Sequence, residues 1–161
     1  MRGTISRVLW GLCAACLFGC VLTGTQLTPP ADSKIGGEEA MTTSLYWKQL
    51  REISTVQTKS DDMRVLADAI RKQMDSIRAL STAGVDAELV QHAEAVAACH
   101  ERFLTVVDQA AYTVEALKKS PDLRRSFMEA GRQTGEAQAR LKGLRPKLIA
   151  RYGTELPHLD K

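Results

Sequence analysis

The stretch AELVQHAEAVAACHERFLTVVDQAAYTVEALKK, residues 87–119, decides the fold that the sequence predicts. Its apolar residues recur at alternating spacings of four and three, which is the period of one face of an α-helix. A second apolar stripe follows the first every seven residues, and two adjacent stripes indicate a wide face that contacts two other helices. The first stripe is Leu89, Ala93, Val96, His100, Phe103, Val107, Ala110, Val114 and Leu117, and the second is Val90, Ala97, Leu104 and Ala111.

The next helix begins immediately afterwards. Ser120-Pro121-Asp122 supplies a capping side chain, a first-turn proline and an acidic second position, which together mark a helix start. Pro146 is expected to kink this helix or loosen its end, and Gly153 and Pro157 to close it. Its apolar stripe repeats the same spacing through Leu123, Phe127, Ala130, Thr134, Ala137, Leu141, Leu144 and Leu148.

A third helix is predicted over residues 43–81, with two apolar faces separated by the polar segment 57–62. A continuous helix that changes register there is expected, and the alternative is a break in which Ser60 and the acids after it cap a fresh helix. The first face is Tyr46, Leu50, Ile53 and Val56, and the second is Met63, Leu66, Ile70, Met74, Ile77 and Leu80.

The connection between the helices predicted over residues 43–81 and 87–119 is short. Gly84 suits the left-handed position after a helix end, Asp86 suits an N-cap, and Val85 is placed to pack on Val90. A short connector makes the helices that it joins antiparallel neighbours. The sequence therefore predicts an all-α fold: an elongated, coiled-coil-like antiparallel three-helix bundle, about 50 Å long at 1.5 Å per residue.

Charge favours contact between the helix predicted over residues 87–119 and the other two. Residues 86–117 carry six acidic residues and one basic residue, a net charge of −5, whereas residues 118–151 carry ten bases and three acids, a net charge of +7. Residues 43–81 carry a net charge of +2 from seven bases and five acids. The surplus of positive charge on the last helix leaves open a basic face for an anionic lipid, polymer or protein.

The chain begins with Arg2 and Arg7, which precede a mostly apolar run, Val8 to Phe18. A positively charged start, a short apolar segment and a small-residue cleavage site are typical of a secretory signal peptide. The run ends in Leu17-Phe18-Gly19-Cys20, which resembles the lipobox of bacterial lipoproteins. The resemblance implies cleavage before Cys20, a diacylglyceryl group on its thiol and an acyl chain on the new amino terminus. More than one chain gives stable attachment to a bilayer.

Two alternatives to lipidation stay open. One is an ordinary signal peptide cut near Thr23-Gly24-Thr25, and the other is an uncleaved N-terminal anchor, although Val8 to Leu22 is shorter than the roughly 20 residues that span a bilayer. Val21 stands where enteric lipoproteins retained at the inner membrane have Asp, so the resemblance favours the outer membrane.

These features divide the chain into four parts. We expect a lipoprotein signal peptide over 1–19, an acylated cysteine and flexible linker over 20–42, the helical bundle over 43–153 and a C-terminal tail over 154–161. Removing the signal discards Cys13 and Cys16 and leaves Cys20 and Cys99, which cannot form a disulfide framework. Without Arg2 and Arg7 the chain has 20 basic and 19 acidic residues, so its charge gives no argument for a nucleic-acid partner.

Few residues are candidates for chemistry. His92, Cys99 and His100 form the one cluster of reactive types, but metal pairs on a helix favour i, i+4 spacing, and a Cys–His nucleophile needs contact and an orienting group. A buried thiol beside a histidine in the apolar stripe is the expectation, with a register or pH role for His100 as an alternative. Methionines at helical spacing are usually core residues rather than haem or copper ligands. These are Met63, Met74 and Met128.

The predicted function is therefore a non-enzymatic binding or structural element of the bacterial cell envelope. It would be anchored at Cys20 on the periplasmic or outer-membrane side, with no catalytic, metal or cofactor residues. Its partners would be the membrane, through the lipid, and an envelope protein or a second copy. The alternatives are a soluble periplasmic helical adaptor with an ordinary signal peptide, and a metal- or haem-binding bundle.

Overall fold

The computed structural model describes residues 37–54 and 62–159. Helix accounts for 81% of these residues and none of them lies in a strand, which confirms the all-α class. No helix within these ranges is long and apolar enough to cross a membrane. The helices are α2 (Gly37–Ser54), α3 (Met63–Arg78), α4 (Ala87–Gln109), α5 (Val114–Lys119), α6 (Pro121–Gly143) and α7 (Arg145–Tyr152).

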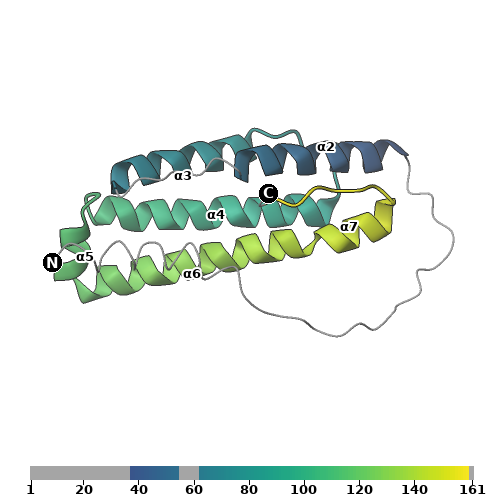
Figure 1. Cartoon of the computed structure of the whole chain (residues 1–161). Coiled ribbons are helices and arrows are strands. Elements are labelled where there is room, and N and C mark those ends of the chain that lie inside the picture. Colours follow the sequence, from purple (N-terminus) through teal and green to yellow (C-terminus); the bar gives the residue numbers. More distant parts are fainter. Residues whose placement is uncertain (1–36, 55–61, 160–161) are drawn as a thin grey trace, which may run out of the picture.

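Helix α4 lies between the others (Figure 1). Helices α2 and α3 follow one another along one side of it, and α6 and α7 follow one another along the opposite side. The most extensive packing joins α4 to α6 and α4 to α3. The first predicted apolar stripe of α4 is buried from Leu89 to Ala110, and the Phe103 ring packs at a tilt against Phe127 of α6 with centroids 5.0 Å apart.

The prediction of one helix over residues 87–119 is wrong. Helix α4 ends at Gln109, and Ala111 and Tyr112 then adopt left-handed backbone with φ of 49° and 58°. The Tyr112 hydroxyl donates to Asp108, and its ring lies beneath the Arg64 guanidinium at 5.8 Å. Thr113 caps α5 by accepting from the Ala116 N–H, so the chain turns and α5 packs on α6.

The prediction of a continuous helix over residues 43–81 is also wrong. Asp62 has extended backbone (φ −82°, ψ 118°), and its carboxylate caps α3 by accepting from the Arg64 N–H at 2.8 Å. Val56 and Ser60, for which an apolar position and a cap were predicted, lie outside the described residues. The preceding helix, α2, begins at Gly37, inside the segment predicted as linker, with two acidic residues in its first turn.

The predicted helix ends of the connector and of the last helix are confirmed. Gly84 and Gly153 have φ of 68° and 65°, a backbone conformation that a side chain strains. The Ser120 hydroxyl accepts from the Leu123 N–H at 3.2 Å and begins α6. Pro146 lacks the N–H that a continuous helix needs, and α6 ends at Gly143 before α7 begins at Arg145.

The residues after Gly153 belong to the core, in contrast to the predicted tail. Leu156 and Leu159 are 3% and 4% exposed, and they pack in the same apolar cluster as the fully buried Trp47. The Trp47 indole N–H donates to the Pro157 carbonyl at 2.7 Å, and the Ser54 hydroxyl donates to the Leu159 carbonyl at 2.7 Å. These bonds hold residues 157–159 against α2.

Replacing Leu156 tests whether this segment stabilises the fold. Leu156→Ala is expected to lower the free energy of unfolding by about 2–4 kcal/mol, because it removes a buried side chain and leaves a cavity. His158→Ala, at an exposed position of the same segment, is the matched control and is expected to stay within about 0.5 kcal/mol of the parent. Urea unfolding of both variants measures the difference, and equal stabilities would show that the segment is not part of the core.

Candidate functional site

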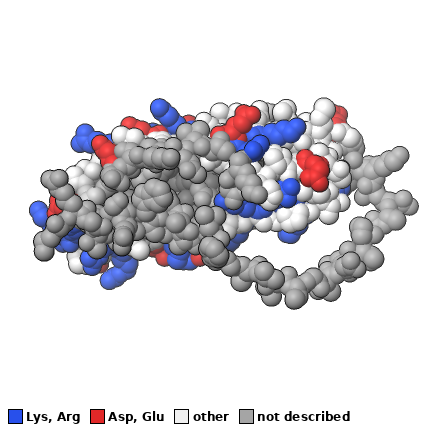
Figure 2. All heavy atoms as spheres, viewed as in Figure 1, with Lys and Arg blue, Asp and Glu red and all other residues white. Residues whose placement is uncertain are grey.

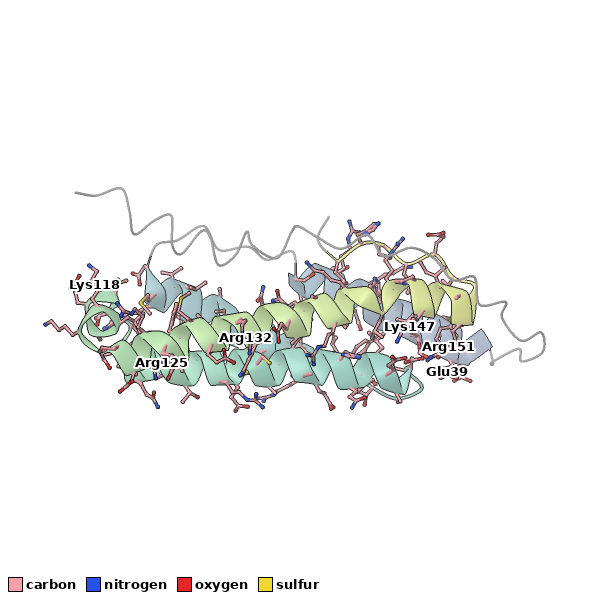
Figure 3. All side chains as sticks on the ribbon, turned by 90° about the horizontal axis from the view of Figure 1, so that it is seen from below. Glu39, Lys118, Arg125, Arg132, Lys147 and Arg151 are labelled. Carbon is pink, nitrogen blue, oxygen red and sulfur yellow. The ribbon has the colours of Figure 1, made fainter. Side chains whose placement is uncertain are left out.

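The most organised polar group of the described residues surrounds the N-terminus of α4, and we call it the Asp86 cluster. It draws side chains from α2, from the start of α4 and from α7, three segments that are far apart in the sequence. Figure 3 labels Glu39, Lys147 and Arg151 at this end of the molecule. The members are Glu39, Thr43, Asp86, Glu88, Lys147, Arg151 and Tyr152.

Asp86 is the centre of the cluster and is 2% exposed. Its Oδ1 accepts from the Leu89 N–H at 3.0 Å, which caps α4, and its own N–H donates to Thr43 Oγ1 at 3.0 Å. Its Oδ2 accepts from the Tyr152 hydroxyl at 2.8 Å and from Arg151 Nη1. One residue thereby joins α2, α4 and α7.

Burial and hydrogen bonding act on Asp86 in opposite directions. Burial alone would raise the pKa of this carboxyl, but the hydrogen bonds from Tyr152, the Leu89 N–H and Arg151 outweigh it, and the pKa is lowered. A carboxylate near a helix N-terminus is also stabilised by the helix dipole. Asp86 is therefore charged at neutral pH and contributes to stability in that form.

Tyr152 and Arg151 extend the cluster in two directions. The single Tyr152 hydroxyl proton faces two carboxylates, Asp86 at 2.8 Å and Glu39 Oε1 at 3.0 Å, and burial followed by these two acceptors raises the pKa of the phenol. Arg151 Nη2 lies 3.3 Å from Glu88 Oε2, and Lys147 Nζ lies 3.1 Å from Glu88 Oε1. The Lys147 hydrogen bond is the main cause of the lowered pKa of Glu88.

Charges elsewhere pair largely within their own helices. Arg132 binds Glu129 at 2.6 Å and also Glu136, and the hydrogen bonds from Arg132 and then Gln133 lower the pKa of Glu129 to about 2. Arg78 joins α3 to α4 through Glu101 at 2.8 Å. Acidic and basic side chains lie interspersed on the face that Figure 2 shows. The charges predicted ion pairs between the acidic helix over 87–119 and the basic last helix. Such pairs occur at the Asp86 cluster, between α7 and the start of α4.

The side chains of the Asp86 cluster pair with one another and so hold α2, the start of α4 and α7 together. Each acidic side chain in it accepts a hydrogen bond from a neighbour, and Asp86 itself is shielded from solvent. The sequence predicted Asp86 as a cap, but it missed Tyr152, Glu39 and Thr43. A tyrosine, a threonine and an acid on separate helices share no local pattern, and only the charge difference between helices pointed toward this pairing.

The predicted cluster of reactive types contains one buried polar side chain. His100 is 4% exposed, and its Nδ1 has no hydrogen-bond partner among the described residues. Cys99 is a half-buried free thiol, and His92 is half-buried. Over residues 37–54 and 62–159, no three His, Cys, Asp or Glu side chains gather in a way that could hold a metal ion.

The three methionines and Cys20 are the remaining positions that the sequence singled out. Met63 and Met74 are buried in the core, whereas Met128 is 44% exposed on α6. Cys20, the predicted lipidation site, lies outside the described residues, so its acylation stays a prediction. Comparison with protein-family models, with curated proteins and with solved structures finds no match to this chain.

Substitution of Asp86 tests whether this residue holds α2, α4 and α7 together. Asp86→Ala is expected to lower the free energy of unfolding by about 2–4 kcal/mol, because it removes a cap and leaves Arg151 and Tyr152 without their shared acceptor. Asp86→Asn keeps a capping oxygen and is the matched control, with a smaller loss. Because the folded pKa of Asp86 is lowered, its contribution is present above the unfolded pKa, about 3.9, and is lost as pH falls through the folded pKa. Urea unfolding between pH 7 and pH 3 measures both effects. Equal losses of unfolding free energy in the two variants would contradict the proposed role of the Asp86 carboxylate.

His100 gives a second dependence on pH, at higher values. Burial lowers the pKa of this imidazole, so the unfolded chain binds a proton more readily than the folded one, and stability falls as pH drops below about 6.5. His100→Leu is expected to reduce the loss of unfolding free energy between pH 7 and pH 5. His158→Ala, at an exposed position, is expected to retain the slope of the parent. If His100→Leu shows the same dependence of stability on pH as the parent, the His100 imidazole does not cause that dependence.

Proposed function

We propose that this chain is a lipoprotein of the bacterial cell envelope whose helical part is a non-enzymatic binding or structural element. The observation that carries the proposal is the sequence Leu17-Phe18-Gly19-Cys20 at the end of a short apolar run that follows two arginines. Acyl chains on Cys20 would attach the protein to a bilayer, because each buried methylene contributes about 0.8 kcal/mol and two or more chains give stable binding.

The helical part suits a mechanical role near such an anchor. Helix α2 is the first described element after Cys20, and its first two turns contain Glu39 and Thr43, which belong to the Asp86 cluster. A force applied to the proposed linker would therefore be transmitted through α2 to α4 and α7. We further propose that the helices act as three antiparallel rods: α2 with α3, α4 alone, and α6 with α7.

The alternative is a soluble periplasmic adaptor with the same helical body and an ordinary signal peptide. The two proposals differ in whether residue 20 is acylated, and both have the same helices. An experiment on Cys20 therefore separates them without changing the fold.

The anchor is tested on the full-length chain expressed in a bacterial host. We expect the mature protein to begin at Cys20, with its N-terminal peptide carrying a diacylglyceryl group and an amide-linked acyl chain, and the protein to sediment with membranes. Cys20→Ala is expected to abolish the lipid mass and release the chain from the membrane fraction. Cys16→Ala, four residues earlier, is the matched control and should behave as the parent.

Mass spectrometry of the N-terminal peptide and fractionation, with and without an inhibitor of signal peptidase II, provide the readout. An unmodified residue 20, or processing that neither the inhibitor nor Cys20→Ala alters, would refute lipidation. A mature chain cut near residues 23–25 and found in the soluble fraction would favour the adaptor.

A further inference from the structure

Helix α2 carries large apolar side chains on its outer face as well as on its buried face. Met41 and Leu45 are 66% and 57% exposed, one turn apart, while Tyr46, Trp47 and Leu50 point into the core. The other large apolar side chains that stand exposed among the described residues, on α3 and α6, are single and have no such neighbour on their own helix. A helix with two apolar faces is expected to contact two partners.

The exposed apolar pair lies between two exposed charges, and we call the four residues the α2 outer stripe. They are Glu38, Met41, Leu45 and Lys48, at spacings of three, four and three. These spacings place all four side chains on one face over about 15 Å of helix. Read in the opposite direction the spacings are the same, but the charge at each end changes sign.

We propose that the α2 outer stripe pairs with the same stripe of a second copy of this chain in an antiparallel, two-fold symmetric contact. In that register Met41 lies opposite Leu45 of the other copy, and Glu38 lies opposite Lys48. The two-fold axis repeats each of these contacts. Closed dimers are built from self-complementary patches of this kind, and opposite charges beside an apolar seam fix its direction and register.

The charges of the stripe favour a second copy over a lipid surface. A helix that lies on an anionic membrane carries several basic residues beside its apolar face. The stripe has one acid and one base at opposite ends, which would gain nothing from a uniform negative surface. Both charges are satisfied at once when an identical stripe runs in the opposite direction.

The size of the stripe indicates where the contact forms. Stable dimers in dilute solution bury at least about 1,200 Å² in total, and two turns of helix supply only part of that area. Copies held on one membrane have a raised effective concentration, which strengthens a weak contact. This last step alone depends on the proposed anchor, whereas the register of the pairing does not.

Disulfide trapping tests the register in the full-length chain. One tagged copy carries Leu45→Cys and a second, differently tagged copy carries Met41→Cys, so one apolar contact of the pair stays intact. We expect the cross-linked heterodimer to exceed that formed by Leu45→Cys with Met128→Cys by about fivefold, because Met128 lies on α6 and outside the stripe. Copies without the added cysteines give the background from the native thiols. Equal yields for the two cysteine pairs would overturn the proposed register.

Charge exchange tests the pairing itself, with the same two reporter cysteines as readout. Glu38→Lys in both copies, or Lys48→Glu in both copies, opposes like charges and is expected to lower the yield by about fivefold. Glu38→Lys in one copy with Lys48→Glu in the other restores both opposite-charge pairs and is expected to restore the yield. Lys72→Glu in both copies, an exposed change on α3, is the control and should have no effect.

A mixed pair that cross-links no better than the Glu38→Lys pair would overturn the proposal. So would a yield that none of the charge changes affects, which is the result expected if the stripe rests on lipid headgroups. The N-terminal mass of the same samples reports acylation of Cys20 separately. A failed anchor and a failed pairing can therefore be told apart.

Discussion

The wide apolar face of α4 is the constraint on which the rest of the structure depends. Its first stripe is buried from Leu89 to Ala110. In the second stripe Ala97 and Leu104 are buried, Val90 is half-buried, and Ala111, beyond the helix end, is exposed. Helices α3 and α6 pack against this face, and α5 and α7 pack on α6. His100 lies in the same face, and its buried Nδ1 finds no hydrogen-bond partner within the described part of the chain, which costs free energy relative to an apolar side chain.

The Asp86 cluster fixes the relative position of helices whose packing is otherwise apolar. Dispersion and burial hold helices together, but they allow sliding, whereas a buried carboxylate with donors on two other segments fixes one position. The ion pairs of α6 lie mostly along its own surface and contribute little to its position. The Asp86 cluster therefore fixes the relative position of α2, α4 and α7 at the end of the bundle where α2 begins.

The sequence predicted the local features well because their causes are local. The apolar stripes of α4 and α6, the Asp86 and Ser120 caps and the left-handed Gly84 each follow from a few neighbouring residues. Two features were missed because residues far apart in the sequence take part in them. The Tyr112 ring, at the end of α4, lies against Arg64 of α3, and the residues after Gly153 lie against α2, where the Trp47 indole N–H donates to the Pro157 carbonyl. The partners of Asp86 come from distant helices, so no spacing in the sequence could reveal them.

Native-state hydrogen exchange, read residue by residue on the full-length protein, tests most directly whether α4 is the element that holds the others. We expect the amides of α4 that lie along its buried face to exchange only through global unfolding, while those of α5 and α7 also exchange through local opening at lower free energy. Amides of α4 that exchange faster than those of α3 and α6 would contradict the central place of α4.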